Sequence, residues 1–390
     1  MYNIATLNKI SHEGTCLLGS NYNLTDDVND AEGILVRSAD MHSMEFSDKL
    51  VAIARAGAGV NNIPVDRCAD EGIVVFNTPG ANANAVKELV LCALLVAARN
   101  VSPALAWTKD LRETCGELGI AKATEKGKSQ FVGHEIYGKT LGVIGLGAVG
   151  VQVANAAEEL GMKVIGYDPY ITVHAAHILS NSIPVTGNLD ALLPQCDYIS
   201  IHVPAMDSTK GMINADKIKL MKDGVVFLNF SRDKLVNEKD MLEALDSGKV
   251  AKYVSDFPND TTLGHPGVIC MPHLGASTQE AEDNCAVMAV RQMMDYIENL
   301  NITNSVNFPA CSLGPRRTKA RIGVMNRNIP KMISQNTNIF AELNINISDM
   351  INRSKGDYAY TLIDVDDTFD EVEVRKALEF EGIIAVRIVY

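Results

Sequence analysis

Long apolar runs, an excess of basic residues and paired cysteines are all missing from this chain of 390 residues. No apolar stretch reaches the ~20 residues that a membrane-spanning helix needs. The first residues, MYNIATLNKI, lack the basic and apolar blocks of a signal peptide. We therefore expect a cytoplasmic protein with no membrane partner.

Positive charge is in deficit, because 35 Lys and Arg face 48 Asp and Glu, for a net charge of −13. Such a balance argues against binding nucleic acid or anionic lipid surfaces. An anionic ligand would therefore have to be held by a local cluster of cations.

The 8 cysteines form no CxxC pair and do not cluster with histidine. This spacing predicts reduced, mostly buried thiols and no metal site. Repeats and low-complexity tracts are absent as well, which excludes solenoid architectures.

The chain does contain short apolar strands that alternate with helical stretches up to about residue 275. At ~150 residues per domain, the length suggests two or three domains. The alternation predicts an α/β protein with two doubly wound parallel-sheet domains.

The stretch LGVIGLGAVG, residues 141–150, is the strongest motif. It contains a GxGxxG run between a β-prone segment and a helical one, and a second strand then ends on Asp168. Gly145 permits a tight turn, Gly147 lets a pyrophosphate approach the backbone, and Gly150 lets the helix press on the sheet. A carboxylate at Asp168 would accept from a ribose 2′-OH and repel a 2′-phosphate, which predicts NAD rather than NADP. The loop residues expected at the cofactor are Gly145, Leu146, Gly147, Ala148, Val149 and Gly150.

Four later strands are predicted to stop at His202, Arg232, Asp256 and His273. If the strands are parallel, their ends share one edge of the sheet with the glycine loop, and ligands collect at that edge. The clustering predicts a catalytic cleft there.

In residues 1–80, two predicted strands are followed by Arg37-Ser38 and by RAGAGV at 55–60. Arg37, Ser38, Arg55 and the amides of Ala58 and Gly59 are candidates for an anion site at this second strand edge. The alternative, that each arginine is a surface residue near a loop, stays open.

The last ~70 residues restart as a separate unit, with strands and helices expected in the order β-α-β-β-α-β. This order is ferredoxin-like.

LGVIGLGAVG with Asp168, DYISIHVP at 197–204, LNFSRDKLV at 228–236 and PHLGAST at 272–278 resemble the D-2-hydroxyacid dehydrogenase family. RAGAGVNNI at 55–63, Arg37-Ser38 and the C-terminal unit resemble more narrowly its D-3-phosphoglycerate dehydrogenases that carry an ACT regulatory domain.

The resemblance implies a flavodoxin-like substrate domain (1–97 and 280–308), a Rossmann NAD domain (98–279), a linker (309–320) and an ACT domain (321–390). It implies NAD-dependent oxidation of 3-phospho-D-glycerate to 3-phosphohydroxypyruvate, the first step of L-serine biosynthesis. A homodimer or homotetramer is expected. The apolar helices 83–98 and 280–299 could line its interface or be internal.

The resemblance also assigns roles. His273 would be the general base, Arg232 would bind the substrate carboxylate, and Asp260 would be the carboxylate paired with the histidine. Arg37, Ser38 and Arg55 would hold the substrate's phosphate or carboxylate. The further residues expected beside NAD are His202, Val203, Pro204, Thr209, Phe230, Ser231, Asp256, His273, Gly275 and Ala276.

Several positions depart from the family pattern. Asp260 stands where a Glu is usual, and Asp233 stands where a Gly usually follows the arginine. In the C-terminal unit, Asn326 and Lys331 replace the His and Gly of a loop that can bind an amino-acid effector, while Asn328 remains. Asn326 and Asn328 are therefore candidate contacts to an effector such as serine.

Two other functions stay open at this point. One is a glyoxylate or hydroxypyruvate reductase on the same fold, which would need no phosphate site. The other is a non-catalytic, NADH-sensing corepressor or scaffold, which would turn over no 2-hydroxy acid.

Overall fold

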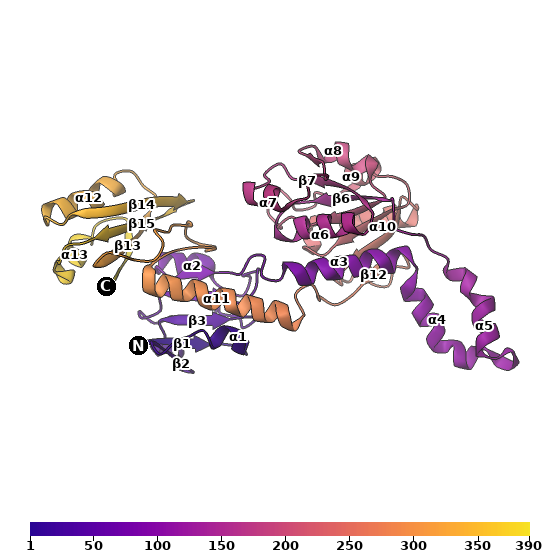
Figure 1. Cartoon of the computed structure of the whole chain (residues 1–390), viewed down its shortest axis with the longest axis horizontal. Coiled ribbons are helices and arrows are strands. Elements are labelled where there is room, and N and C mark those ends of the chain that lie inside the picture. Colours follow the sequence, from indigo (N-terminus) through magenta and orange to yellow (C-terminus); the bar gives the residue numbers. More distant parts are fainter. The chain divides into compact units, whose positions relative to one another are not determined.

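The computed structural model describes all of residues 1–390 and divides the chain into two compact units (Figure 1). One unit combines Met1–Asn82 with Gln279–Tyr390, and the other is Ala83–Thr278.

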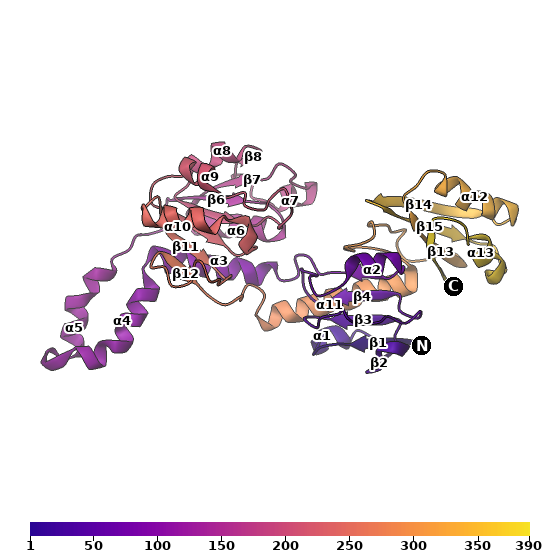
Figure 2. The same ribbon diagram turned by 180° about the vertical axis from the view of Figure 1, so that it is seen from behind.

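The unit formed by residues 83–278 (Figure 2) is built on a seven-stranded parallel sheet with the order β12-β11-β10-β9-β6-β7-β8. This is the Rossmann order with one added strand, so the predicted doubly wound fold is confirmed. The strands are β6 (Thr140–Ile144), β7 (Lys163–Tyr167), β8 (Val185–Thr186), β9 (Tyr198–Ile201), β10 (Val225–Asn229), β11 (Val250–Ser255) and β12 (Val268–Cys270).

Helices cover both faces of this sheet, as the nearly continuous apolar strands require. They are α3 (Ala83–Ala98), α6 (Ala148–Glu159), α7 (Val173–Ile178), α8 (Leu189–Leu192), α9 (Ala215–Leu220) and α10 (Glu238–Asp246).

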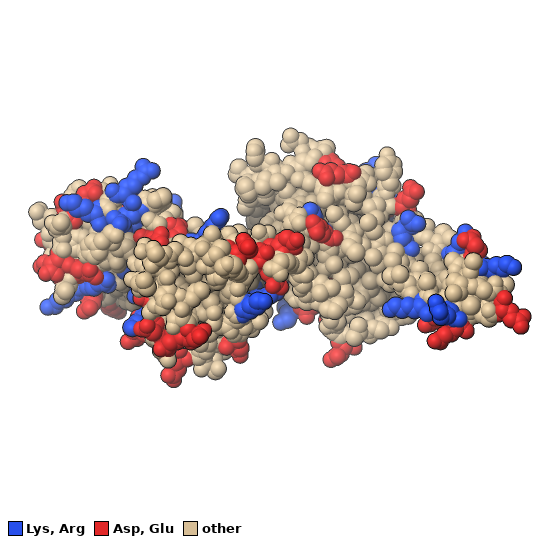
Figure 3. Space-filling view, turned by 60° about the horizontal axis from the view of Figure 1, so that its bottom comes forward, with Lys and Arg blue, Asp and Glu red and all other residues tan.

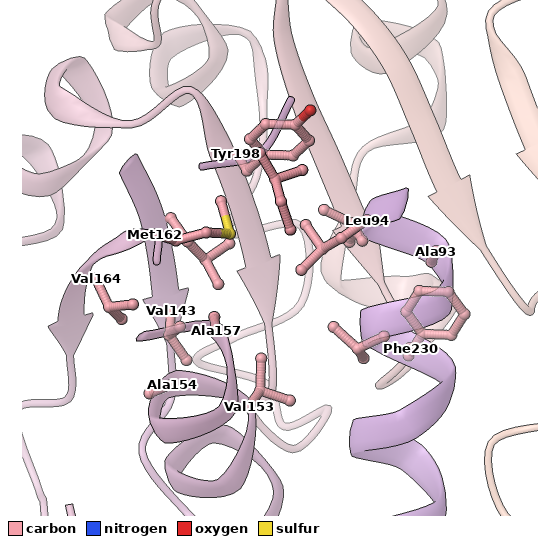
Figure 4. Packing of buried hydrophobic residues seen from close by; sticks show 14 of the residues in the cluster. Ala93, Leu94, Val143, Val153, Ala154, Ala157, Met162, Val164, Tyr198 and Phe230 are labelled. Atoms are coloured by element: carbon pink, nitrogen blue, oxygen red, sulfur yellow. The ribbon is translucent and has the colours of Figure 1, made fainter. Parts of the chain in front are cut away.

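Helix α3 belongs to this unit, which differs from the domain division expected at residues 97 and 98. Its side chains Ala93 and Leu94 pack into one core with Val153 of α6 and with Phe230, which follows β10 (Figure 4). The apolar character of α3 correctly indicated burial but could not say against which sheet. The division therefore falls before residue 83.

A helical hairpin follows α3 and extends away from the sheet (Figure 1). It consists of α4 (Val101–Thr114) and α5 (Ile120–Gly127), and its contacts include the ring pair of Trp107 and Phe131, whose centroids are 5.4 Å apart. The hairpin, on the right in Figure 3, carries Lys, Arg, Asp and Glu side chains side by side. No single helix is long and apolar enough to span a membrane. The consecutive helices α3 and α4 are long and apolar enough only when taken together, and they are bent by 68° relative to each other.

The other unit begins with a five-stranded parallel sheet in the order β2-β1-β3-β4-β5. This is the flavodoxin-like order, as expected. Its strands are β1 (Tyr2–Thr6), β2 (Tyr22–Thr25), β3 (Gly33–Val36), β4 (Ala52–Arg55) and β5 (Val74–Phe76). The helices of this part are α1 (His12–Thr15), α2 (Val65–Asp70) and α11 (Gln279–Asn299), and α11 packs on the sheet through Ala289, Val290, Met293 and Tyr296.

The C-terminal part of the same unit has the predicted βαββαβ order. It comprises β13 (Ala320–Arg327), α12 (Met332–Glu342), β14 (Ile347–Lys355), β15 (Tyr358–Val365), α13 (Glu371–Ala377) and β16 (Ile383–Val389). The antiparallel sheet runs β14-β15-β13-β16, which is the ferredoxin-like arrangement.

A fully buried arginine connects this sheet to the segment that precedes it. The guanidinium of Arg321, 1% exposed, donates to both carboxylate oxygens of Asp364 at 2.6 and 2.9 Å. Its remaining Nη1 donates to the carbonyl oxygens of Asn299 at 2.9 Å and Gly314 at 2.7 Å. One side chain therefore fixes both the end of α11 and the middle of the expected linker against this sheet.

Candidate active site

The glycine loop between β6 and α6 has the conformation and the close packing that the GxGxxG motif predicted. Gly145 has φ +91°, a left-handed conformation that L side chains rarely adopt. A Cβ on Gly150 would lie 1.9 Å from the carbonyl oxygen of Gly145, whereas a Cβ on Gly147 would meet nothing within 4 Å. The loop is thus tightly packed on the protein side and open at the position where a pyrophosphate would approach.

Asp168 directly follows β7 and is fixed against this loop. Its carboxylate accepts from the amide of Leu146 at 2.9 Å and from the amide of Tyr170 at 2.8 Å. The acid is therefore held beside the loop, as a group that recognises a ribose must be. These residues fit NAD. Substitution of the glycines tests this assignment without a measurement of turnover.

We expect Gly150→Ala and Gly147→Ala to fail in different ways. The methyl group at 150 collides with backbone, so the free energy of unfolding should fall by about 1–3 kcal/mol. The methyl group at 147 points into open space, so stability should be unchanged while NADH binds at least ~10-fold more weakly, because its pyrophosphate loses close backbone approach. Chemical denaturation and NADH fluorescence titration measure the two effects. Equal loss of stability in both variants would contradict the expectation.

Four predicted strand ends do lie at one edge of the sheet, since β9, β10, β11 and β12 run parallel to one another and to β6. His202 follows β9 and its Nε2 lies 2.8 Å from the hydroxyl oxygen of Ser200. Burial lowers the pKa of His202 to about 4, so its imidazole is neutral at pH 7. Ser231, after β10, donates to the carbonyl oxygen of Val203 at 2.6 Å.

The other expected cofactor residues lie at or near the same edge. Thr209 donates to the carbonyl oxygen of Pro204 at 2.6 Å, which folds the loop after β9 back on itself. Gly275 is buried and Ala276 half-buried in the loop after β12.

His273 lies three residues beyond β12, and its ring contacts the ring of Phe257 with centroids 4.8 Å apart. The carboxylate that interacts with it electrostatically is Asp256, at the end of β11. Asp256 is 1% exposed, and its Oδ2 accepts from the amide of Gly275 at 3.0 Å while Oδ1 has no partner. Burial raises the pKa of Asp256, and the neighbouring His273 lowers it in part.

Asp260, the carboxylate expected to pair with the histidine, is placed differently. Its side chain is exposed and makes no hydrogen bond or ion pair. The loop that contains it is held by Asn259, which accepts from the amides of Thr261 at 3.1 Å and Thr262 at 2.9 Å. The carboxylate that interacts electrostatically with His273 is Asp256, and the pairing of Asp260 with the histidine stays a prediction.

Asp256→Asn should make the protein more stable at neutral pH. Because the folded-state pKa is raised, the charged carboxylate disfavours folding above that pKa, and this penalty disappears as the pH falls below the unfolded value near 4. We expect the variant to gain about 1 kcal/mol in free energy of unfolding at pH 7, with the gain shrinking toward pH 4. Thermal unfolding at several pH values checks this, with Asp260→Asn as the exposed control. A loss of stability at pH 7 would contradict the pKa direction.

Arg232 follows β10, and its side chain is only lightly engaged. Nη1 donates to the carbonyl oxygen of Ser231 at 2.6 Å, and Asn229 holds the backbone by donating to the carbonyl oxygen of Arg232 at 2.8 Å. The unusual neighbour Asp233 turns its carboxylate onto the amide of Lys234 at 2.8 Å. Most of the guanidinium donors therefore remain available to an anion.

In the other unit, the two predicted arginines meet at the ends of neighbouring strands. Arg55 donates from Nε to the carbonyl oxygen of Arg37 at 3.1 Å. A Cβ on Gly57 would lie 2.1 Å from Nη1 of Arg55, so only glycine lets this guanidinium fold over the loop. The amides of Ala58 and Gly59 have no partner within the protein. The residues expected at the anion site thus lie together as a cluster, with Ser38 exposed at its edge.

The sequence did not single out two residues of this cluster. Asn8, two residues after β1, accepts with Oδ1 from the amides of Arg37, Ser38 and Ala39 at 3.1, 2.9 and 2.9 Å. Glu282, in the first turn of α11, accepts from Nη2 of Arg37 at 2.7 Å. Applying the strand-end rule to β1 as well would have found Asn8, whereas no local pattern marks Glu282.

The candidate effector residues lie at the end of β13. Asn326 is 1% exposed, donates to the carbonyl oxygen of Arg327 at 2.7 Å and leaves its Oδ1 unpaired. Asn328 donates to the carbonyl oxygen of Gly356 at 3.0 Å. Both line a cavity of about 630 Å³ together with Lys331, Ser334, Thr337 and Asn352.

Known proteins are similar in sequence to most of this chain. The sequence profile described as "D-isomer specific 2-hydroxyacid dehydrogenase, NAD binding domain" matches residues 91–275. A D-3-phosphoglycerate dehydrogenase of Haemophilus influenzae is 31% identical over 89% of this chain and 83% of its own length. The chain belongs to the D-2-hydroxyacid dehydrogenase family. The resemblance stated from the motifs and the cofactor NAD are thereby confirmed.

Further members of the D-2-hydroxyacid dehydrogenase family extend the comparison. The D-3-phosphoglycerate dehydrogenase of Methanocaldococcus jannaschii is 35% identical over 78% of this chain, and that match covers 58% of the relative. This chain thus spans little more than half the length of several relatives that it matches. The NAD⁺-bound 3-phosphoglycerate dehydrogenase structure of Entamoeba histolytica superimposes with a TM-score of 0.62 at 25% identity, covering 78% of this chain and 98% of that one.

Proposed function

We propose that this protein oxidises 3-phospho-D-glycerate to 3-phosphohydroxypyruvate with NAD, the first step of L-serine biosynthesis. One observation carries the proposal. His273 and Arg232 follow strands of one parallel sheet, at the same edge as a glycine loop that fits NAD. A base and a carboxylate anchor are the two groups that oxidation of a 2-hydroxy acid requires from a protein.

Each residue would make a separate contribution. NAD, when bound, supplies the acceptor for the hydride that leaves C2. His273 takes the hydroxyl proton as the carbonyl forms, and returns it in the reverse direction. Arg232 binds the C1 carboxylate and stabilises the charge that develops on the C2 oxygen. Burial raises the pKa of Asp256 and the charge of His273 lowers it in part, so Asp256 would be the carboxylate beside this base.

Selection of a phosphorylated substrate would rest on the cluster of Arg37 and Arg55 with the free amides of Ala58 and Gly59. Two guanidinium groups and free amides are suited to a dianionic phosphate. The relatives named D-3-phosphoglycerate dehydrogenase support this choice over a reductase of unphosphorylated acids.

A spectrophotometric assay of NADH oxidation tests the proposal. Turnover should be higher with 3-phosphohydroxypyruvate than with hydroxypyruvate or glyoxylate, and Arg37→Ala should remove that preference. An equal rate with unphosphorylated acids, unaffected by Arg37→Ala, would instead indicate the reductase. No turnover with any 2-oxo acid would indicate a non-catalytic NADH sensor.

We also propose that the cavity beside Asn326 and Asn328 binds an amino-acid effector. The unpaired buried Oδ1 of Asn326 supplies an acceptor for an ammonium group, and Lys331 supplies a cation for a carboxylate. Serine added to the assay, with Asn326→Ala as the comparison, tests this. Equal rates at all serine concentrations would contradict it.

A further inference from the structure

One acidic side chain lies within the arginine cluster of the proposed phosphate site. The Oε1 of Glu282 accepts from Nη2 of Arg37 at 2.7 Å, and the two side chains are 37% and 42% exposed. Burial raises the pKa of the Cys285 thiol, one turn further along α11, and the charges of Arg55, Arg37 and Glu282 also act on it. All of these charges therefore act on the same small volume.

The net charge of this cluster differs from the charge that would balance a bound phosphate. Arg37 and Arg55 are both cationic, and Glu282 cancels one of these charges. A phosphate monoester carries a charge close to −2 at neutral pH. The arginine pair alone would match that charge, whereas the pair with Glu282 does not, and the added carboxylate repels the dianion.

We infer that Glu282 is a specificity-determining residue that weakens the binding of phosphorylated substrates by competing for Arg37. This inference rests on the proposed function, because it concerns the same phosphate site. When a phosphate arrives, it takes up the donors of Arg37 and the ion pair to Glu282 is broken or shared. A substrate that lacks the phosphate leaves the ion pair of Arg37 and Glu282 intact. Removal of the charge of Glu282 therefore does not strengthen the binding of such a substrate.

Glu282→Gln is the direct test, because glutamine keeps the shape and one acceptor but removes the charge. The KM for 3-phosphohydroxypyruvate should fall about 3- to 10-fold, as expected for a partly exposed charge pair. The KM for hydroxypyruvate should change less than ~2-fold by the same reasoning. Glu280→Gln is the matched control, because Glu280 lies in the same helical turn, is exposed and makes no ion pair. An unchanged or higher KM for the phosphorylated substrate in Glu282→Gln overturns the inference.

Calorimetric titration of the NADH-loaded protein with 3-phosphoglycerate separates this test from that of the proposed function. Tighter binding to Glu282→Gln than to the unmodified protein, with weaker binding to Arg37→Ala, supports the inference even if no turnover is found. If 3-phosphohydroxypyruvate is turned over normally, but Glu282→Gln and the unmodified protein bind 3-phosphoglycerate equally well, the inference is overturned and the proposed function stands.

Discussion

Replacing His273 with glutamine is expected to lower turnover by ~10²–10⁴-fold, which is the usual contribution of a general base. Glutamine can still form a hydrogen bond to the substrate hydroxyl but cannot accept its proton. The affinity for NADH should change little, because the glycine loop and Asp168, which are separate from His273, hold the dinucleotide in this proposal.

The pH profile makes this prediction specific to proton transfer. In the unmodified enzyme, kcat/KM for oxidation should fall at acid pH as the base becomes protonated, and that ionisation should disappear from the profile of His273→Gln. His174→Gln is the matched control, because His174 is exposed on α7 and makes no hydrogen bond. Near-full turnover in His273→Gln would refute the role of His273.

Much of the fold could be predicted because its signals are local. The glycine loop, the apolar strands and the residues at their ends depend on neighbours in sequence, and parallel topology then gathers those ends at one edge. The turn at Gly145, the open position at Gly147 and the close packing at Gly150 were expected from the same local reasoning. The βαββαβ order of residues 320–389 was predicted from strand alternation in the same way.

What could not be predicted depends on contacts between distant segments. The apolar surface of α3 fits either neighbouring sheet equally well by composition, so the boundary was placed about 15 residues too late. The pair of Arg37 with Glu282 joins residues 245 positions apart. The family pattern suggested Asp260, which is exposed, whereas the carboxylate that interacts electrostatically with His273 is Asp256. Glu282 lies in the first turn of α11, so its pairing depends on how that helix packs, whereas the position of Asp260 depends on the loop that follows β11.

The second large effect is expected at Arg232. Removing the guanidinium in Arg232→Ala should lower kcat/KM by ~10²–10⁴-fold, because a charge-assisted carboxylate anchor and a stabiliser of the developing oxyanion are lost together. The structure supports this role, since only Nη1 is engaged, with the carbonyl oxygen of Ser231 at 2.6 Å. A guanidinium has five donors, so enough remain for a bidentate contact.

Arg232→Lys separates the two contributions of the arginine. Lysine keeps the charge but has no planar fork, so KM should recover further than kcat if the fork is needed to align the carboxylate with the C2 oxygen. Lys234→Ala is the control for net charge, because Lys234 is exposed two residues away and its side chain forms no ion pair. If Arg232→Lys matched the unmodified enzyme in both constants, charge alone would suffice and the bidentate role would be wrong. If Arg232→Ala also retained activity, the carboxylate anchor would have to lie elsewhere, and the strand-end cluster would lose one of the two groups on which the proposed reaction depends.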